Sequence, residues 1–190
     1  MDLDRLPRNP DPITEEGIRR AAVLIPVIDT AGRIQLLFTK RAEWLTRHPG
    51  QMSFPGGTRE PTDADSFETA LREAREEVGI RSNETNLVGR LSDIRTISGF
   101  AVTPIVAQVP DRAYEPDGGE IVEAVVLPLE EFLDPDNFER KWRPGPSGVK
   151  EPVEFFYVDG YTVWGATGRL VAQLLEQTTD WSLSEEPATR

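Results

Sequence analysis

A well-defined helix over residues 65–79 is the feature that most limits how this chain can fold. Glu68 follows Asp65 at the spacing of a capping box, and Gly79 supplies a typical helix stop. Between them, apolar residues recur at intervals of four, three and four: Phe67, Leu71, Ala74 and Val78. This spacing predicts a helix with one buried stripe, which needs a sheet or another helix to cover it.

Patterns of alternating or continuous apolar residues predict strands on both sides of this helix. A hairpin with a turn at residues 29–32 is expected first, and further strands and helices follow. The expected strands are 21–28, 33–40, 87–94, 100–109, 121–126, 155–158 and 161–164, the last two joined by Asp159-Gly160. The expected additional helices are 14–20, 128–133 and 166–177, and the expected long loops are 41–66 and 134–152.

The length of 190 residues, with 16 prolines and 15 glycines, favours one α/β domain with many turns. We expect this single domain to span residues 1–190, with residues 1–20 and 178–190 as less ordered ends. The loop 41–66 is too long for an ordinary connection in a compact domain, and such loops usually carry function.

Composition excludes several classes of protein. A net charge of −12 argues against a nucleic-acid-binding protein and against attraction to anionic membranes. The absence of cysteine excludes disulfides, thiolate metal sites and cysteine nucleophiles. Neither a signal peptide nor an apolar run of transmembrane length is found in the sequence, so we expect a cytoplasmic protein.

Three glutamates of the helix are candidate metal ligands. At about 100° per residue, Glu73, Glu76 and Glu77 fall within an arc of about 100° that points away from the apolar stripe. Like charges on one face destabilise a helix, whereas a divalent cation such as Mg²⁺ or Mn²⁺ would make them favourable. The alternative is a solvated acidic face with Arg72 and Glu76 as an ordinary i,i+4 pair.

Together with the Gly56-Gly57 pair, residues 72–80 (Arg-Glu-Ala-Arg-Glu-Glu-Val-Gly-Ile) resemble the signature of Nudix hydrolases. The resemblance implies an α/β/α sandwich around a mixed β-sheet, and a metal-dependent enzyme that cuts nucleoside diphosphates linked to another moiety. The first half of the signature departs from the family, because its usual glycine falls on Thr58 and its usual first glutamate on Ala64. The role of that glutamate is therefore assigned to no residue.

Residues 36–57 look like the extra motif of the coenzyme A pyrophosphatase branch, which shares the shifted spacing up to residues 69–73. Residues 163–167 also resemble the segment that opens the last helix of that branch. This resemblance implies hydrolysis of coenzyme A or its derivatives to adenosine 3′,5′-bisphosphate and 4′-phosphopantetheine or its acyl form. Two alternatives stay open: a Nudix enzyme for another nucleotide, and a non-catalytic ligand-binding protein of this fold.

The resemblance also implies roles for individual residues. Glu73 and Glu77 are the first metal ligands and Glu76 the next. Arg72 is expected to orient a glutamate or the glycine-loop backbone. Gly56 and Gly57 are expected to let the backbone approach closely or adopt positive φ. Apart from the resemblance, the candidates for the general base are, in order, Glu120 in the loop 117–120, Glu123 and Glu76. The alternative for Glu120 and Glu123 is a charge at the edge of a strand.

The loop over residues 39–59 is basic within an acidic chain, with a local balance of +3. Coenzyme A carries a 3′-phosphate besides its diphosphate, so Arg41, Arg47 and Arg59 are expected to bind substrate. Scattered surface charge is the alternative. His48, the only histidine, is expected to shape the loop. The oligomeric state is open, with a homodimer among the expected forms.

Overall fold

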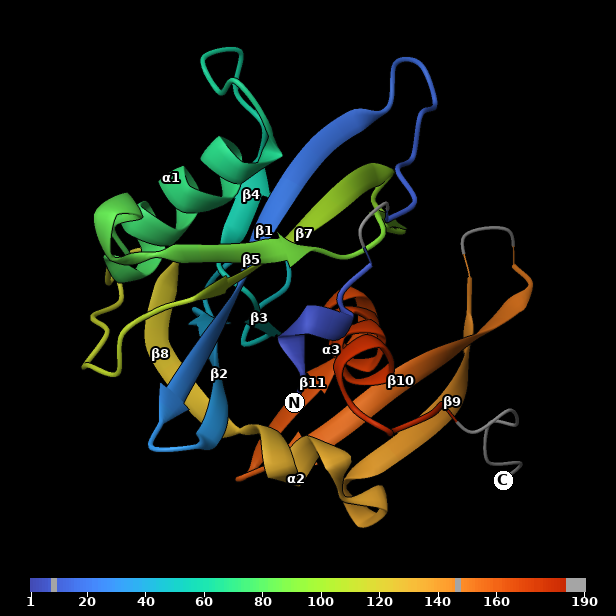
Figure 1. Ribbon diagram of the computed structural model, residues 1–190. Helices are drawn as coiled ribbons and strands as arrows, with labels where there is room; N and C mark the ends of the chain where they lie inside the picture. Colours follow the sequence, from blue (N-terminus) through green and yellow to red (C-terminus); the bar gives the residue numbers. More distant parts are fainter. Residues whose placement is uncertain (8–9, 146–147, 184–190) are drawn as a thin grey trace.

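The computed structural model describes residues 1–7, 10–145 and 148–183, and shows two β-sheets with helices packed around them (Figure 1). The larger sheet has eight strands in the order β3-β2-β1-β7-β5, with β4 paired to β1, β6 to β7 and β8 to β2. Its strands are β1 (Arg19–Thr30), β2 (Arg33–Arg41), β3 (Met52–Ser53), β4 (Gly56–Thr58), β5 (Asn86–Arg90), β6 (Ile94–Arg95), β7 (Phe100–Gln108) and β8 (Ile121–Pro128).

The smaller sheet is antiparallel, in the order β11-β10-β9. Its strands are β9 (Phe138–Pro144), β10 (Lys150–Val158) and β11 (Tyr161–Trp164). The helices are α1 (Ser66–Val78), α2 (Leu129–Leu133) and α3 (Gly165–Thr178), with 3₁₀ turns at Leu3–Arg5, Ser82–Glu84 and Pro135–Asn137. Within the described ranges, every helix is too short or too polar to span a bilayer.

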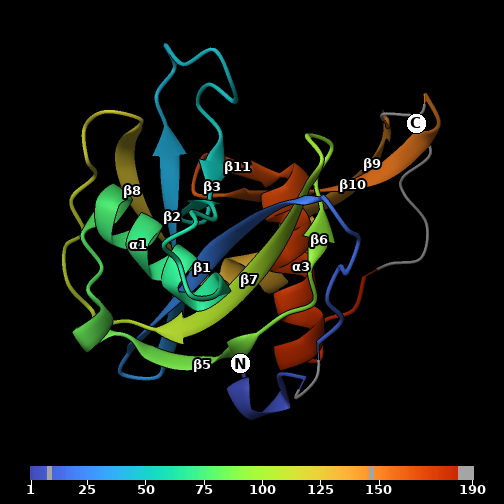
Figure 2. The same ribbon diagram turned by 90° about the horizontal axis from the view of Figure 1, so that it is seen from above.

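The larger sheet lies between two layers (Figure 2). Helix α1 covers one face, where Ala70, Ala74 and Val78 pack with Leu24 and Ile105 of the sheet. Helix α3 and the smaller sheet cover the other face, around a core that includes Phe38, Phe132 and Phe156. The expected α/β/α arrangement around a mixed sheet is therefore confirmed.

The central strand β1 forks on one of its edges. Along the other edge it runs parallel to β7 over residues 19–27 without interruption. On the forked edge, residues 21–23 pair with β4 and residues 27–30 pair with β2. Pro26, which has no N–H to donate, lies at the fork, so no ladder hydrogen bond is lost there. The fork leaves room for the strand β4 beside β1 and under α1.

The elements that were predicted from nearby capping and turn residues are confirmed. Asp65 caps α1 by accepting a hydrogen bond from the Glu68 amide at 2.9 Å, and Gly79 ends the helix with φ 69°. The first hairpin forms as expected, and Asp159 and Gly160 adopt the positive φ values of a primed turn. In the apolar stripe Leu71 is only half-buried, and Ala70 takes its place because α1 lies close to β1.

Four other expectations were wrong in detail. The predicted helix over 14–20 is absent, because the chain turns at Gly17 (φ 75°) and β1 begins at Arg19 to pair with β7. The predicted loop 134–152 holds most of the β9–β10 hairpin. The loop 41–66 contains the short strands β3 and β4, and the predicted strand 87–94 is divided into β5 and β6. The start of β1 depends on a partner in β7 that is distant in sequence, whereas β9 and β10 are neighbours whose pairing the proline-rich composition concealed.

Candidate active site

Two glutamates of α1 face the glycine strand β4. The amide of Gly56 donates a hydrogen bond to Oε2 of Glu77 at 3.2 Å. A Cβ on Gly57 would lie 2.5 Å from the carboxyl carbon of Glu73, and one on Gly56 would lie 2.5 Å from the carbonyl oxygen of Ala22. A side chain at either position would displace the Glu73 carboxylate or push β4 off β1. Close approach of the backbone is therefore what these glycines permit.

The carboxylates of Glu73 and Glu77 are withdrawn from water beside each other. Burial raises the pKa of Glu77 to about 8, an effect that the Gly56 amide and Arg41 oppose and that the charges of Glu73 and Asp117 increase. Burial also raises the pKa of Glu73, against the contrary effect of Arg72. At both acids the desolvation outweighs the nearby positive charge of Arg72 or Arg41, and a bound cation would favour the charged carboxylates.

Arg72 is the centre of a hydrogen-bond network that shapes this pair. Its Nη1 donates to Oε1 of Glu73 at 2.9 Å, and its Nη2 donates to the carbonyl of Thr58 at 3.0 Å. On its other side it forms two 3.2 Å hydrogen bonds to the carboxylate of Asp63. Arg72 thus connects a glutamate to the end of the glycine strand, in agreement with an orienting role.

Asp63 is a residue of this site that the sequence analysis did not assign. Its buried carboxylate also accepts hydrogen bonds from the Glu60 amide at 2.9 Å and the Thr69 hydroxyl at 3.0 Å. The hydrogen bond from Arg72 is the main reason that the pKa of Asp63 falls to about 2. Asp63 adjoins Ala64, on which the family's first glutamate would fall, so an acid one position away was the available signal.

Glu76 has different surroundings from its two neighbours. Its side chain is 54% exposed and lies 3.5 Å from Nη1 of Arg72, the i,i+4 pair that was the alternative interpretation. Within the described part of the chain, no three acidic or histidine side chains are already grouped as metal ligands. Glu76 is thus more exposed than Glu73, although both carboxylates lie within 3.5 Å of Nη1 of Arg72. The prediction that Glu76 is a third ligand stays a prediction.

A hard divalent cation fits the pair of carboxylates formed by Glu73 and Glu77. Glu73 and Glu77 offer only oxygen donors, which suit Mg²⁺ or Mn²⁺, and these ions usually keep several waters or take substrate phosphate oxygens as further ligands. A metal at Glu73 and Glu77 would also compensate the buried negative charge at these two residues.

Glu120 and Glu123 lie on opposite faces of the larger sheet. Nη2 of Arg41 donates to Oε2 of Glu120 at 3.2 Å, and the positive charge of Arg41 also acts on Glu77. Glu120 therefore lies on the same side of the sheet as α1 and Glu77. Glu123 instead accepts a hydrogen bond from Tyr161 of β11 and lies 3.8 Å from Nζ of Lys40. The expectation that Glu123 faces away from Glu120 agrees with these contacts.

The three arginines expected to bind substrate have different surroundings. Arg41 pairs with Glu120, whereas Nη2 of Arg59 donates to the carbonyls of Asp63 and Ala64 at 3.1 and 2.7 Å. Arg47 is exposed between β2 and β3, and forms no hydrogen bond or ion pair with any described residue. In the same loop the ring of His48 lies 2.8 Å from Oε1 of Gln51, which fits a structural role.

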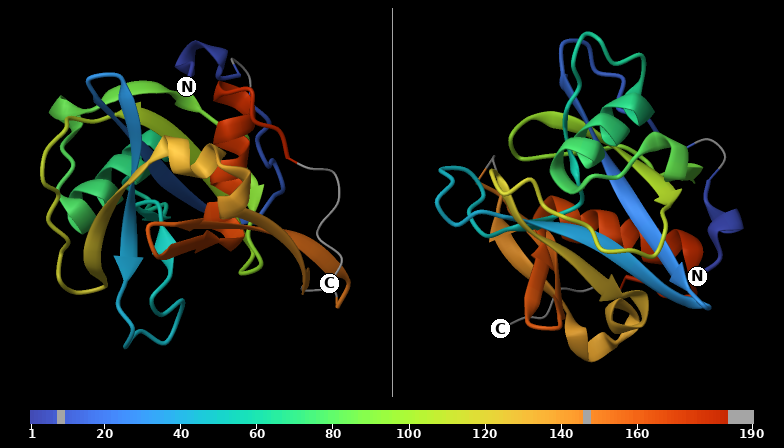
Figure 3. Two further views of the ribbon diagram at one scale, coloured as in Figure 1. Left: turned by 90° about the horizontal axis from the view of Figure 1, so that it is seen from below. Right: turned by 90° about the vertical axis from the view of Figure 1, so that its left-hand side faces the viewer.

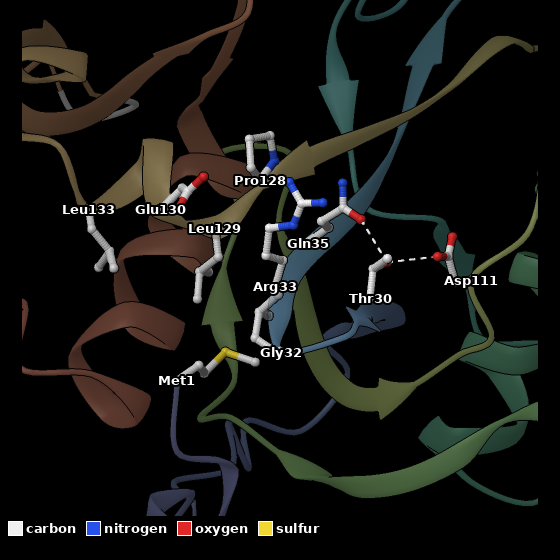
Figure 4. A pocket seen from close by; sticks show the side chains of 11 residues that line it. Met1, Thr30, Gly32, Arg33, Gln35, Asp111, Pro128, Leu129, Glu130 and Leu133 are labelled. Carbon is white, nitrogen blue, oxygen red and sulfur yellow. Dashed lines mark hydrogen bonds between the residues drawn. The ribbon is translucent and has the colours of Figure 1, made fainter.

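A hollow of about 540 Å³ lies at the other end of the sheet, around the turn between β1 and β2 (Figure 4). Thr30 at its rim hydrogen-bonds both Gln35 and Asp111. Strand β2 runs from Arg33, which lines this hollow, to Arg41 at the candidate site, about 25 Å along an extended strand. None of the candidate site residues is among the described residues that line it.

Metal binding at this pair predicts a change in stability. We expect excess Mg²⁺ or Mn²⁺ to raise the Tm of the protein by roughly 5–10 °C, because a ligand of the folded state stabilises it. Glu77→Gln should lose most of that rise, and in chelator it should be at least as stable as wild type, because a carboxyl that is costly to desolvate is replaced by an amide of the same size. An equal rise in both proteins, measured by differential scanning calorimetry, would contradict this assignment.

Comparison with known proteins agrees with this architecture. The NUDIX domain matches residues 18–146. The chain is 36% identical over 159 residues to NudL of Yersinia enterocolitica, described as an uncharacterized Nudix hydrolase, covering 83% of this chain and 80% of NudL. NudL of Yersinia pestis is 35% identical over 162 residues, covering 85% of this chain and 80% of the relative.

Two solved structures show the same fold. An Ap4A hydrolase from C. elegans, in a binary complex, has a TM-score of 0.50 at 20% identity, covering 60% of this chain and 83% of that one. The Nudix hydrolase RenU from M. smegmatis also has a TM-score of 0.50 at 20% identity, covering 58% and 71%. At this level of identity the likeness concerns the fold alone.

Proposed function

This chain belongs to the Nudix family of hydrolases, and from that premise we propose that it hydrolyses the pyrophosphate bond of coenzyme A or its derivatives. It is a pyrophosphohydrolase, and the proposal concerns its substrate, its metal and its residues. The products would be adenosine 3′,5′-bisphosphate and 4′-phosphopantetheine or its acyl form.

The observation that carries the choice of coenzyme A is the loop between β2 and β3, residues 42–51. It belongs to the stretch that resembles the coenzyme A pyrophosphatase motif, and it presents the exposed Arg47. The loop begins beside the catalytic residues, because the amide of Ala42 donates to the carbonyl of Glu120 at 2.9 Å. A cation free of protein partners, in a loop that begins beside Glu120, suits the additional phosphate of coenzyme A.

The proposed mechanism gives each residue a separate task. Mg²⁺ or Mn²⁺, held by Glu73 and Glu77 with Glu76 as a further candidate ligand, would neutralise the diphosphate and help to activate water. Arg72 orients Glu73 and the end of β4. Glu120 accepts the proton from water as it attacks one phosphorus, and the bond from that phosphorus to the bridging oxygen breaks.

The test of this proposal is a panel of substrates. The pure protein is incubated with Mg²⁺ or Mn²⁺ and separately with coenzyme A, acyl-coenzyme A, a nucleotide sugar and a deoxynucleoside triphosphate, and the products are identified by mass. Adenosine 3′,5′-bisphosphate from coenzyme A at the highest kcat/KM supports the proposal. A higher kcat/KM for another nucleotide would assign the enzyme to that substrate, and binding without turnover would favour a non-catalytic protein.

Replacement of Arg47 should change the KM for coenzyme A more than the KM for dephospho-coenzyme A, which lacks the 3′-phosphate. A hydrogen bond to a charged group contributes about 1.5–3 kcal/mol, so Arg47→Ala should raise KM for coenzyme A about tenfold or more. The KM for dephospho-coenzyme A should change little. Arg33→Ala, an exposed arginine at the other end of β2, is the control. Equal effects of Arg47→Ala on both substrates would contradict contact with the 3′-phosphate.

A further inference from the structure

The connection between β7 and β8, residues 109–120, is fastened to the last turn of α1. It passes the C-terminal end of α1 before β8 begins (Figure 3). Nη2 of Arg112 donates to the carbonyl of Gly79 at 2.9 Å, and the amide of Asp117 donates to the carbonyl of Glu77 at 2.9 Å. The second of these bonds joins the connection directly to a residue that we assign to the metal.

Asp117 also folds the turn that leads to Glu120. Oδ1 of its carboxylate accepts hydrogen bonds from the amides of Gly119, at 3.2 Å, and Ile121, at 2.9 Å. The turn is closed by the amide of Gly118, which donates to the carbonyl of Ile121 at 3.1 Å with Gly118 at φ 73°. One side chain therefore determines the path of the backbone on both sides of Glu120.

The turn places Glu120 next to β2. Its carbonyl accepts from the amide of Ala42, and its carboxylate accepts from Arg41. Glu120 itself is exposed, with 66% of its side chain accessible, so packing does not hold it in place. Its position depends on these two contacts and on the turn made by Asp117.

We propose that Asp117 is a positioning residue for hydrolysis, which sets the place of Glu120 relative to the metal-binding end of α1. The proposal rests on the role of Glu120 as general base in the function proposed above. Asp117 touches neither substrate nor metal in this scheme. It acts by holding two segments together, the backbone at Glu77 and the turn that carries Glu120.

The test measures kcat and KM of Asp117→Ala with the best substrate of the panel. Misplacement of a catalytic group lowers the rate steeply, so kcat should fall about tenfold while KM and the metal concentration for half-maximal rate stay the same. Asp117→Asn keeps the acceptor oxygen and should remain within about twofold of wild type.

Asp29→Ala is the matched control for loss of a turn-capping aspartate. Asp29 accepts a hydrogen bond from the amide of Gly32 at 2.7 Å in the β1–β2 turn, at the other end of the sheet. Its replacement should lower stability without changing kcat. The same kcat for Asp117→Ala and Asp29→Ala would overturn the proposal.

The double variant Asp117→Ala/Glu120→Gln separates this proposal from the proposals on the general base and on the substrate. If Asp117 acts only through Glu120, Asp117→Ala should cause no further loss of kcat when combined with Glu120→Gln. A further tenfold loss would overturn the coupling, and so would a wild-type kcat for Glu120→Gln. Failure of the coenzyme A assignment would appear separately, as a different preferred substrate of the wild-type enzyme.

Discussion

Glu77→Gln and Glu73→Gln are each expected to lower kcat by about 10³-fold while the fold stays intact. A metal contributes several kcal/mol to the stabilisation of charge in the transition state, and each 1.4 kcal/mol or so corresponds to a factor of ten. Glutamine keeps the size of the side chain but removes the charge that a hard cation needs. Steady-state kinetics over a titration of Mn²⁺ or Mg²⁺ will measure the loss.

Glu130→Gln in α2, an exposed glutamate remote from α1, is the control and should keep the wild-type rate. Circular dichroism of each variant shows whether the fold is retained. Near-normal rates of both Glu73→Gln and Glu77→Gln in saturating metal would mean that α1 is not the source of the ligands.

Glu120→Gln is expected to lower kcat by about 10²–10⁴-fold, the usual contribution of a general base. KM and the apparent affinity for metal should change little, because Glu120 is paired with Arg41 and is not assigned to the metal. An exposed charge without a catalytic task would scarcely affect the rate. Single-turnover measurements, with enzyme in excess over substrate and with saturating metal, test this directly.

Glu123→Gln is the control, because Glu123 contacts Tyr161 and Lys40 on the opposite face of the sheet. A large loss of kcat in Glu123→Gln with a mild effect in Glu120→Gln would transfer the role of base to Glu123. Mild effects of both substitutions would leave Glu76 as the first candidate.

The sequence predicted best the elements whose signals are local. The cap at Asp65 and the stop at Gly79 lie within the helix that they delimit, and the turn Asp159-Gly160 determines its own hairpin. The β9–β10 hairpin has no such short turn, and the proline-rich composition of residues 134–152 hid its pairing. The start of β1 was missed because its partner in β7 is about 80 residues away.

The same distinction applies to the candidate site. The spacing of Glu73 and Glu77 placed them one helical turn apart, and the nearness of Gly56 and Gly57 to them followed from the resemblance. The buried carboxylate of Asp63 could not be recognised, because its role depends on how the loop after β4 folds back on Arg72. The separation of Arg59 from Arg47 likewise depends on contacts with loop carbonyls, which charge counting does not reveal.

The pairing of β1 with β7 and of β2 with β8 has a consequence for the order in which the protein folds. The glycine strand and the two α1 glutamates lie within residues 56–77, a short segment of chain. Glu120 is placed beside β2 when β8 pairs with β2, and Ile121 pairs with Arg41 across 80 residues. Contacts between distant segments form late, because closing a long loop costs more entropy. During refolding, affinity for metal should therefore return before the capacity for hydrolysis.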